Sequence, residues 1–366
     1  MKKQIIDKNQ ISELENDVFS ILSEQEIDII KKRFGIGLNK ETLEEIGKKY
    51  GVTRERVRQI ESVIIKKIAS IQKQNSKLSS LKKEILNLIE EYGGIVEENF
   101  LLDNFFVGLN KEEKDITKFI LNKLFDDYLD IFKDKKTKSI IYKSKNLNLE
   151  SFNIIKNDIE GIINNVKEPL SFEEIIDKLN LSGVFKKTEE ILSNLYKKSK
   201  TDNFKLFQNT IYSALHVMNN TDLNIFQKWG MKNWKTIKPK RMSDKIYLVL
   251  NKEGKPTHFK KITDIINEYN FDSKKAKDVT VHNELIMDPR YILVGRGIYA
   301  LKEWGYKNGA VSDIIEDLLK NSKNILSKKE IIEKVKEQRL VKDSTIYLAL
   351  TNNPKFKKVK EGYKLA

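Results

Sequence analysis

The chain has 366 residues, of which 39% are hydrophobic, and 68 Lys and Arg outnumber 53 Asp and Glu to give a formal net charge of +15. This length and composition predict two or more small folded domains and exclude a disordered chain, while the charge favours a phosphate-bearing partner or reflects an AT-rich genome rich in Lys codons. With no cysteine, no signal peptide and no long apolar run, we expect a cytoplasmic, nucleoid-associated protein without disulfides or a membrane partner.

Residues 43–68 read as two helices joined by a glycine turn. Thr42 and Glu45 fit a capping box at the start of the first helix, and Gly51 suits a left-handed turn. Thr53 is a good N-cap for the second helix. The apolar residues of that helix recur at helical spacing and predict one buried stripe: Val57, Ile60, Ile64 and Ile68.

The polar residues at the start of the second helix point away from this stripe. Arg can bridge O6 and N7 of guanine, Gln can pair with adenine, Glu can accept from cytosine, and a helix N-terminus suits phosphates. The alternative is a charged helix face that is merely solvated. The capping residues, the glycine turn, the helix lengths and the position of the polar face all agree with a DNA-reading helix-turn-helix and favour that interpretation. The candidate DNA-binding residues here are Thr53, Arg54, Glu55, Arg56, Arg58, Gln59 and Lys66.

The segment from Leu22 to Ile68 contains LSEQEIDIIKKRFGIG and TLEEIGKKYGVTRERVRQIE and closely resembles region 4 of the primary bacterial sigma factors. That resemblance implies reading of the upstream promoter element and docking on the flap of the RNA polymerase core. It makes Arg54, Glu55, Arg56, Arg58 and Gln59 the contacts to bases and phosphates, and Phe34 and Ile36 a packed elbow. In sigma factors this region closes the chain, behind helices that melt the promoter. Here it begins near residue 22, so we expect no stand-alone sigma factor.

Beyond residue 75 the chain repeats itself. Residues 256–301 predict a helix, a second helix and two short strands around Arg296, which is the order of a winged helix. A shift of 87 residues toward the N-terminus aligns PLSFEEIIDKL with PTHFKKITDII. The same shift aligns Ile211 and Tyr212 with Ile298 and Tyr299 and so predicts a strand at these two residues.

A third copy lies 65 residues later, where TIYLALTNNPKF aligns with TVHNELIMDPRY. In this copy Ser327 and Glu330 fit a capping box, and a hairpin is predicted around Glu361-Gly362. A weaker copy lies near residues 80–146, with the helix LKKEILNLIEEY before Gly93-Gly94, the helix DITKFILNKLF, the strands YLDIF and SIIY, and the loop KDKKTKS as its wing.

The predicted fold is therefore mainly α: an N-terminal helix-turn-helix followed by several small winged-helix modules with short β-hairpin wings. The predicted parts are a helix-turn-helix at 1–75, winged-helix modules at 80–146, 152–218, 241–305 and 308–366, and a basic connector at 219–240. The modules at 241–305 and 308–366, through GKPTHFKKITDII and TVHNELIMDPRYILVGRGIYALKEWG, resemble the HARE-type helix-turn-helix. This winged-helix variant occurs in the delta subunit of RNA polymerase, in some restriction systems and in chromatin proteins, and it implies no particular substrate.

Positive charge gathers around the predicted connector, where residues 228–261 hold eleven Lys or Arg against two acids. Lys238, Lys240 and Arg241 are candidates to lie along a duplex backbone. Arg296, between two glycines, either enters a minor groove or is a turn residue. The tryptophans of these segments are interpreted as packing connectors onto modules: Trp229, Trp234 and Trp304.

The sequence predicts no catalytic residue, metal site or cofactor. Its three histidines, His216, His258 and His282, are separated and are expected at the surface or in wings, and no glycine loop for phosphates is present. Asp103, Glu112 and Lys114 have the residue types of a nuclease site, but such triplets are common by chance in a chain that is 33% charged. We therefore expect a binding protein and no enzyme.

Three functions fit these patterns. The favoured one is a sequence-specific DNA-binding transcription regulator that reads a promoter-like duplex with its first domain and grips flanking DNA or polymerase with the winged modules. The second is an RNA polymerase accessory protein similar to the delta subunit. The third is the DNA-binding arm of a defence or restriction system that acts with a separate nuclease.

Overall fold

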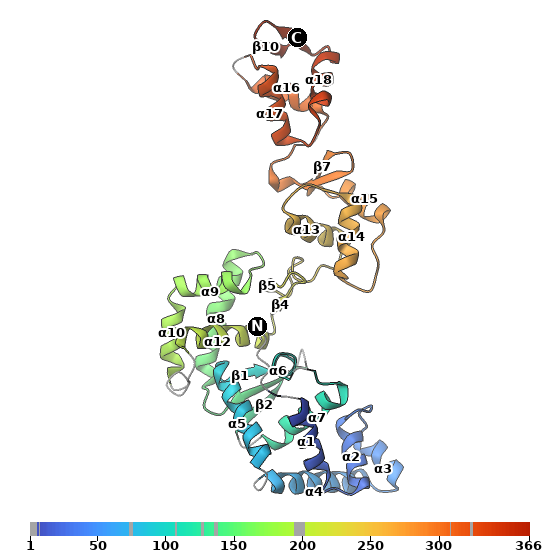
Figure 1. Ribbon diagram of the computed structural model, residues 1–366, viewed down its shortest axis with the longest axis vertical. Helices are drawn as coiled ribbons and strands as arrows, with labels where there is room; N and C mark the ends of the chain where they lie inside the picture. The colour runs from blue at the N-terminus through green and yellow to red at the C-terminus, as the bar shows by residue number, and fades with distance from the viewer. Residues whose placement is uncertain are drawn as a thin grey trace. The chain divides into compact units, whose positions relative to one another are not determined.

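The structure is a computed structural model that describes residues 6, 8–72, 76–106, 108–125, 128–134, 138–193, 202–307, 309–322 and 325–366. It is mainly helical with small antiparallel sheets, as the sequence predicts (Figure 1). The chain forms two compact units, one of residues 1–222 with 228–231 and the other of residues 223–227 with 232–366.

The first unit begins with the predicted helix-turn-helix. Its helices are α1 (Lys8–Phe19), α2 (Glu24–Phe34), α3 (Leu43–Tyr50) and α4 (Arg54–Gln72). The capping box of Thr42 and Glu45 is present, and Gly51 adopts the left-handed conformation with φ 64°. Both predictions are thus confirmed. In α4, Val57 packs with Ile29 of α2 and Ile46 of α3 in a small core of this domain.

The next module shares its core with the helix-turn-helix. Its elements are α5 (Ser76–Glu91), β1 (Ile95–Glu97), α6 (Glu98–Phe105), α7 (Lys111–Leu124), β2 (Leu129–Lys133) and β3 (Ile140–Ser144). Ile64 and Ile68 of α4 and Ile11 of α1 join a buried cluster that continues through α5 and α7 to Tyr142 of β3. The two predicted helices are present as α5 and α7 and the two predicted strands as β2 and β3, whereas β1 and α6 were not predicted; the strand order is β1-β3-β2. Part of the loop expected as a wing, residues 135–137, lies outside the described residues.

The second module departs from the repeat alignment. Its elements are α8 (Leu149–Val166), α9 (Phe172–Leu181), α10 (Val184–Ile191), α12 (Asn203–Val217), β4 (Thr221–Leu223) and β5 (Trp229–Met231). Ile211 and Tyr212, predicted in a strand, lie in α12, so that prediction is wrong. Trp229 takes the strand position instead, because its backbone exchanges hydrogen bonds with Leu170. The short strands β4 and β5 thus lie within the segment predicted as a connector.

Packing explains why residues 203–217 are helical. Asp202 caps α12 by accepting hydrogen bonds from the backbone N–H groups of Phe204 and Lys205. Its buried residues recur at helical spacing: Phe207, Ile211, Ala214 and Leu215. The helix also lies beside β1 (Figure 1). The hydroxyl of Ser213 in this helix donates a hydrogen bond to the carbonyl of Ile95. The alignment matched the start of the module and missed this inserted helix.

The second unit contains the third and fourth modules. The third comprises α13 (Met242–Glu253), β6 (Thr257–His258), α14 (Phe259–Tyr269), α15 (Asp278–Met287), β7 (Tyr291–Gly295), β8 (Ile298–Leu301) and the short 3-10 helix η1 (Lys302–Trp304). The fourth comprises α16 (Val311–Asn321), α17 (Lys328–Gln338), α18 (Asp343–Asn352), β9 (Phe356–Val359) and β10 (Gly362–Leu365). The predicted hairpins around Arg296 and Gly362 and the capping box of Ser327 and Glu330 are confirmed.

A recurring pair of contacts closes the sheet of each module. A residue before the second helix pairs with a buried aromatic residue of the last strand, and the residue after it caps that helix. The four bridged pairs are Val96–Tyr142, Leu170–Trp229, Thr257–Tyr299 and Leu326–Tyr363. The capping residues are Glu97, Ser171, His258 and Ser327. In each module, two consecutive residues therefore hold the last strand and the start of the second helix next to each other.

Candidate nucleic-acid interface

The first two turns of α4 present a polar face to solvent. Thr53 begins the helix, because its Oγ1 accepts a hydrogen bond from the backbone N–H of Arg56 at 3.2 Å. The sequence-predicted residues of these turns are all exposed: Thr53, Arg54, Glu55, Arg56, Arg58 and Gln59. Lys66, further along α4, is exposed as well. A helix N-terminus that carries such groups has the chemistry to meet base edges and phosphates.

Two intrahelical contacts organise these side chains. Arg58 donates to Glu55 through Nε at 2.9 Å and Nη2 at 2.7 Å, and Nη1 of Arg56 donates to Oε1 of Gln59 at 3.3 Å. The hydrogen bond from Arg58 lowers the pKa of the Glu55 carboxyl and raises the pKa of the guanidinium. Because both partners are exposed, the pair contributes little to stability and can rearrange on a ligand.

The opposite side of α4 is anchored to the protein. Val57, Ile64 and Ile68 are fully buried and Ile60 partly so, which confirms the predicted stripe. Arg33 of α2 also pairs with Glu61 of α4, with Nε and Oε2 3.0 Å apart. The helix is thus fixed along its length, and its polar face remains available to a partner.

The segment between α2 and α3 packs inward, as expected for Phe34 and Ile36. Ile36 is fully buried, and the ring of the partly buried Phe34 lies 4.8 Å from that of Phe119 in α7. This elbow therefore contacts the next module as well as the helix-turn-helix.

The other candidate cations lie in the second unit. Lys238, Lys240 and Arg241 are exposed just before α13, and Arg296 is exposed at the turn between β7 and β8. Arg241 occupies the N-cap position of α13 without capping it through its side chain. These residues belong to a different compact unit from α4.

The tryptophans and histidines have mainly structural positions. Trp229 is 2% exposed, and the half-buried Trp304 packs against the apolar clusters of the third module, so the packing interpretation is confirmed for these two residues. Trp234 is half-buried. His258 caps α14, where its Nδ1 accepts from the N–H of Lys260 at 3.3 Å.

His216 is not the surface residue that the sequence suggests. Its ring stacks on Phe100 at 4.6 Å and meets Trp229 edge-on at 4.9 Å. The Nε2 atom is buried without a hydrogen-bond partner in the described part of the chain. Burial lowers the pKa of His216 to about 4, and the opposing effect of Asp222 is smaller. The ring is therefore neutral at physiological pH and joins the aromatic contact between the first and second modules.

The three residues of nuclease type do not converge. Nζ of Lys114 lies 2.8 Å from Oδ1 of Asp103, whereas Glu112 pairs at 2.8 Å with Lys31 of α2. Within the described ranges, no three His, Cys, Asp or Glu side chains form a group that could hold a metal ion. Among the helices that the structure describes, none has the length and apolarity needed to cross a membrane.

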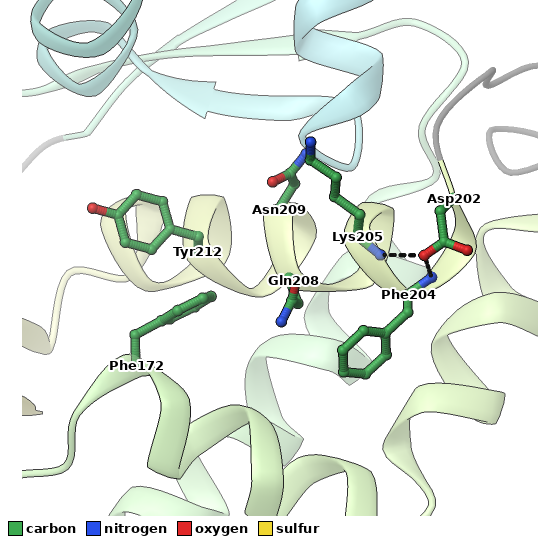
Figure 2. A pocket seen from close by; sticks show the side chains of 7 residues that line it. All are labelled: Phe172, Asp202, Phe204, Lys205, Gln208, Asn209 and Tyr212. Carbon is green, nitrogen blue, oxygen red and sulfur yellow. Dashed lines mark hydrogen bonds between the residues drawn. The ribbon is translucent and has the colours of Figure 1, made fainter. Parts of the chain in front are cut away.

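A groove of about 420 Å³ lies along α12, a feature that the sequence did not indicate. Figure 2 shows Phe172 and Tyr212 together at one end and Phe204 near the other, with Gln208 between them. The carboxylate of Asp202 is occupied as the helix cap. Lys205 and Asn209 line the opposite edge of the groove from Phe172 and Phe204, so the polar groups do not converge on one point.

Comparison with known proteins supports the interpretation of the N-terminal segment. Residues 18–69 match the family Sigma-70, region 4. The RNA polymerase sigma factor SigA of a Bacillus species is 47% identical over 53 residues, which cover 14% of this chain and 14% of that protein. The similarity thus spans the helix-turn-helix and no more than about a seventh of either chain.

Proposed function

We propose that this protein is a sequence-specific DNA-binding transcription regulator whose helix α4 reads a promoter-like duplex. One observation carries the proposal: the segment that matches sigma region 4 presents Arg54, Glu55, Arg56, Arg58 and Gln59 on one exposed, firmly anchored helix face. The net charge of +15 supports a polyanionic partner. In this proposal the protein works in the cytoplasm at the nucleoid, as a binding protein without catalytic activity or cofactor.

The remaining modules are proposed to be winged helices, of the HARE type in the second unit. Their support is the order of helix, bridging strand, helix, helix and hairpin in the third and fourth modules. Lys238, Lys240, Arg241 and Arg296 are proposed to grip flanking DNA in a sequence-independent way. They are exposed, as such contacts require.

A second candidate function is that of an RNA polymerase accessory protein. The observation that favours it is the apolar third helix of the third module: Val279, Ile286 and Met287 of α15 are exposed, and α15 contains no Lys or Arg. Such a surface suits a protein partner, including the polymerase core and its flap, better than DNA. Binding to DNA with weak salt dependence would favour this candidate.

Systematic selection of duplexes by the full chain tests the favoured function. The core cluster runs from α1 to β3, so a fragment that ends near residue 75 would lack its packing partners. The parent should enrich a defined sequence, and a variant with Arg58→Ala and Gln59→Ala should lose that enrichment. Recovery of unrelated sequences by the parent would contradict the proposal.

A further inference from the structure

The hairpins of the third and fourth modules have the same register. In β7–β8 the opposed residues are Tyr291–Leu301, Ile292–Ala300 and Leu293–Tyr299. In β9–β10 they are Phe356–Leu365, Lys357–Lys364 and Lys358–Tyr363. Lys357 and Lys364 therefore occupy the positions of Ile292 and Ala300, and the two hairpins can be compared face by face.

In the third module this face is covered by the protein itself. Ile292 and Ala300 are 3% and 0% exposed and pack with Val294 against Trp304 and Tyr306. At the same edge, the backbone N–H of Leu340 donates to the carbonyl of Val294 at 3.0 Å. This hairpin face is thus an apolar contact, whereas Arg296 at its tip is exposed.

In the fourth module the equivalent face carries charge. Lys357 and Lys364 are both exposed and stand directly opposite each other, an arrangement in which like charges repel. Lys360 at the turn is exposed as well. Lys355, at the base of the hairpin, is by contrast paired with Glu316 at 2.7 Å, a carboxylate that also pairs with Lys320. A row of exposed ammonium groups on a narrow hairpin is a surface that a polyanion would stabilise.

The third helix of the same module does not continue this positive surface. The helix α18 has the sequence DSTIYLALTN, without Lys or Arg, and exposes Tyr347 and Leu348. This helix therefore supplies no ammonium group for phosphate neutralisation, whereas the hairpin supplies Lys357, Lys360 and Lys364. Lys328 of α17 is placed over the Tyr347 ring, 3.9 Å from its centroid, on the side of α18.

We propose that the β9–β10 hairpin is a further DNA contact, which binds the phosphate backbone of a duplex through Lys357, Lys364 and Lys360 while α18 stays outside the grooves. The inference rests on the proposed function only in taking duplex DNA as the ligand. The α4 helix supplies sequence discrimination, and the hairpin supplies affinity that does not depend on sequence.

The test measures binding of the full chain to a labelled duplex by fluorescence anisotropy over a range of KCl concentrations. The variant carries Lys357→Glu and Lys364→Glu. The matched control carries Lys329→Glu and Lys334→Glu, which makes the same charge change at exposed residues of α17 in the same module. Circular dichroism and thermal unfolding establish that both variants are folded, and a Lys357→Gln, Lys364→Gln variant separates loss of charge from reversal.

The hairpin variant should bind all duplexes about tenfold more weakly, and the slope of log affinity against log salt should flatten by about two, close to one for each phosphate that is no longer neutralised. The control should remain close to the parent. Equal weakening in both variants, no weakening in either, or weakening confined to single-stranded probes would overturn the proposal.

The same titrations distinguish the two proposals. A parent that binds every duplex equally, but binds more weakly with the hairpin substitutions, would contradict the proposed function alone. A parent that discriminates between duplexes, but is insensitive to the hairpin substitutions, would contradict this inference alone.

Discussion

Arg58 is held against Glu55 by two hydrogen bonds on the exposed side of α4, from Nε to Oε2 at 2.9 Å and from Nη2 to Oε1 at 2.7 Å. The guanidinium fork that would meet O6 and N7 of a guanine is thus already formed and occupied by a carboxylate. Base recognition by Arg58 requires an exchange of partners, which costs little because both side chains are exposed.

We expect Arg58→Ala and Gln59→Ala each to reduce discrimination between the preferred duplex and a scrambled one by about 1–3 kcal/mol, because each removes a base-edge partner. Arg58→Lys should behave like Arg58→Ala, since an ammonium group cannot form the two parallel hydrogen bonds of the guanidinium fork. Competition binding with the full chain measures the difference. Unchanged discrimination in properly folded variants would show that α4 is not the reading helix.

Charge reversal of Lys238, Lys240 and Arg241 should weaken binding to every duplex and flatten the salt dependence, while the order of preferred sequences is retained. The physical reason is that neutralisation of phosphates is independent of sequence. Titrations at several salt concentrations against preferred and scrambled duplexes report both quantities. A salt dependence equal to that of the parent would mean that this segment is solvated and does not touch DNA.

The burial of His216 leads us to expect that the stability of the first unit depends on pH. Burial lowers its pKa from 6.5 to about 4, so the unfolded chain takes up a proton at a higher pH than the folded one does. The contribution of His216 to the free energy of unfolding is therefore fully present above about pH 6.5. It decreases as the pH falls below this value and is lost near pH 4, with a total loss of about 3 kcal/mol.

Urea unfolding of a chain with Trp229 as its only tryptophan, followed by fluorescence between pH 7.5 and 4.5, measures this loss. A further His216→Phe substitution keeps an aromatic ring against Phe100 and should remove most of the slope. A His282→Phe substitution, in the other unit, is the control and should leave it unchanged. A slope that persists in the His216→Phe variant would assign the effect to other groups.

The proposal that the protein lacks catalytic activity is tested with supercoiled and linear DNA in Mg²⁺ or Mn²⁺. Asp103 and Glu112 are paired with Lys114 and Lys31, respectively, and point to different partners. We expect no cleavage, and no effect of Asp103→Asn beyond a small change in stability. Metal-dependent nicking that disappears with Asp103→Asn or Glu112→Gln would establish a nuclease.

Local signals in the sequence were sufficient for much of the helix-turn-helix and of the fourth module. The capping residues Thr42 and Ser327 and the turn residue Gly51 act over three or four positions, and their structures follow from neighbours in the chain. The exposed face of α4 could be predicted because periodicity alone separates it from the buried stripe.

The features that sequence reasoning missed depend on distant contacts. Ile211 is helical because α12 packs on α8 and β1. Its apolar neighbours recur at helical spacing, but the sequence-based prediction followed the repeat alignment instead of this spacing. The pairing of Leu170 with Trp229 joins residues far apart in the chain. Two signals in the sequence could have indicated this pairing: an aromatic residue in the last strand of each module and a capping residue before each second helix.

The position of α12 also has a consequence for how the chain can be divided experimentally. In the sheet that the structure describes, β1 pairs with β3 on one side only, and a bare strand edge invites pairing with other molecules. Ser213 and its helix cover that edge by satisfying the carbonyl of Ile95. A fragment that ends after β3 would keep the whole first sheet and yet expose this edge, so it is expected to self-associate, whereas one that extends past residue 231 should stay monodisperse.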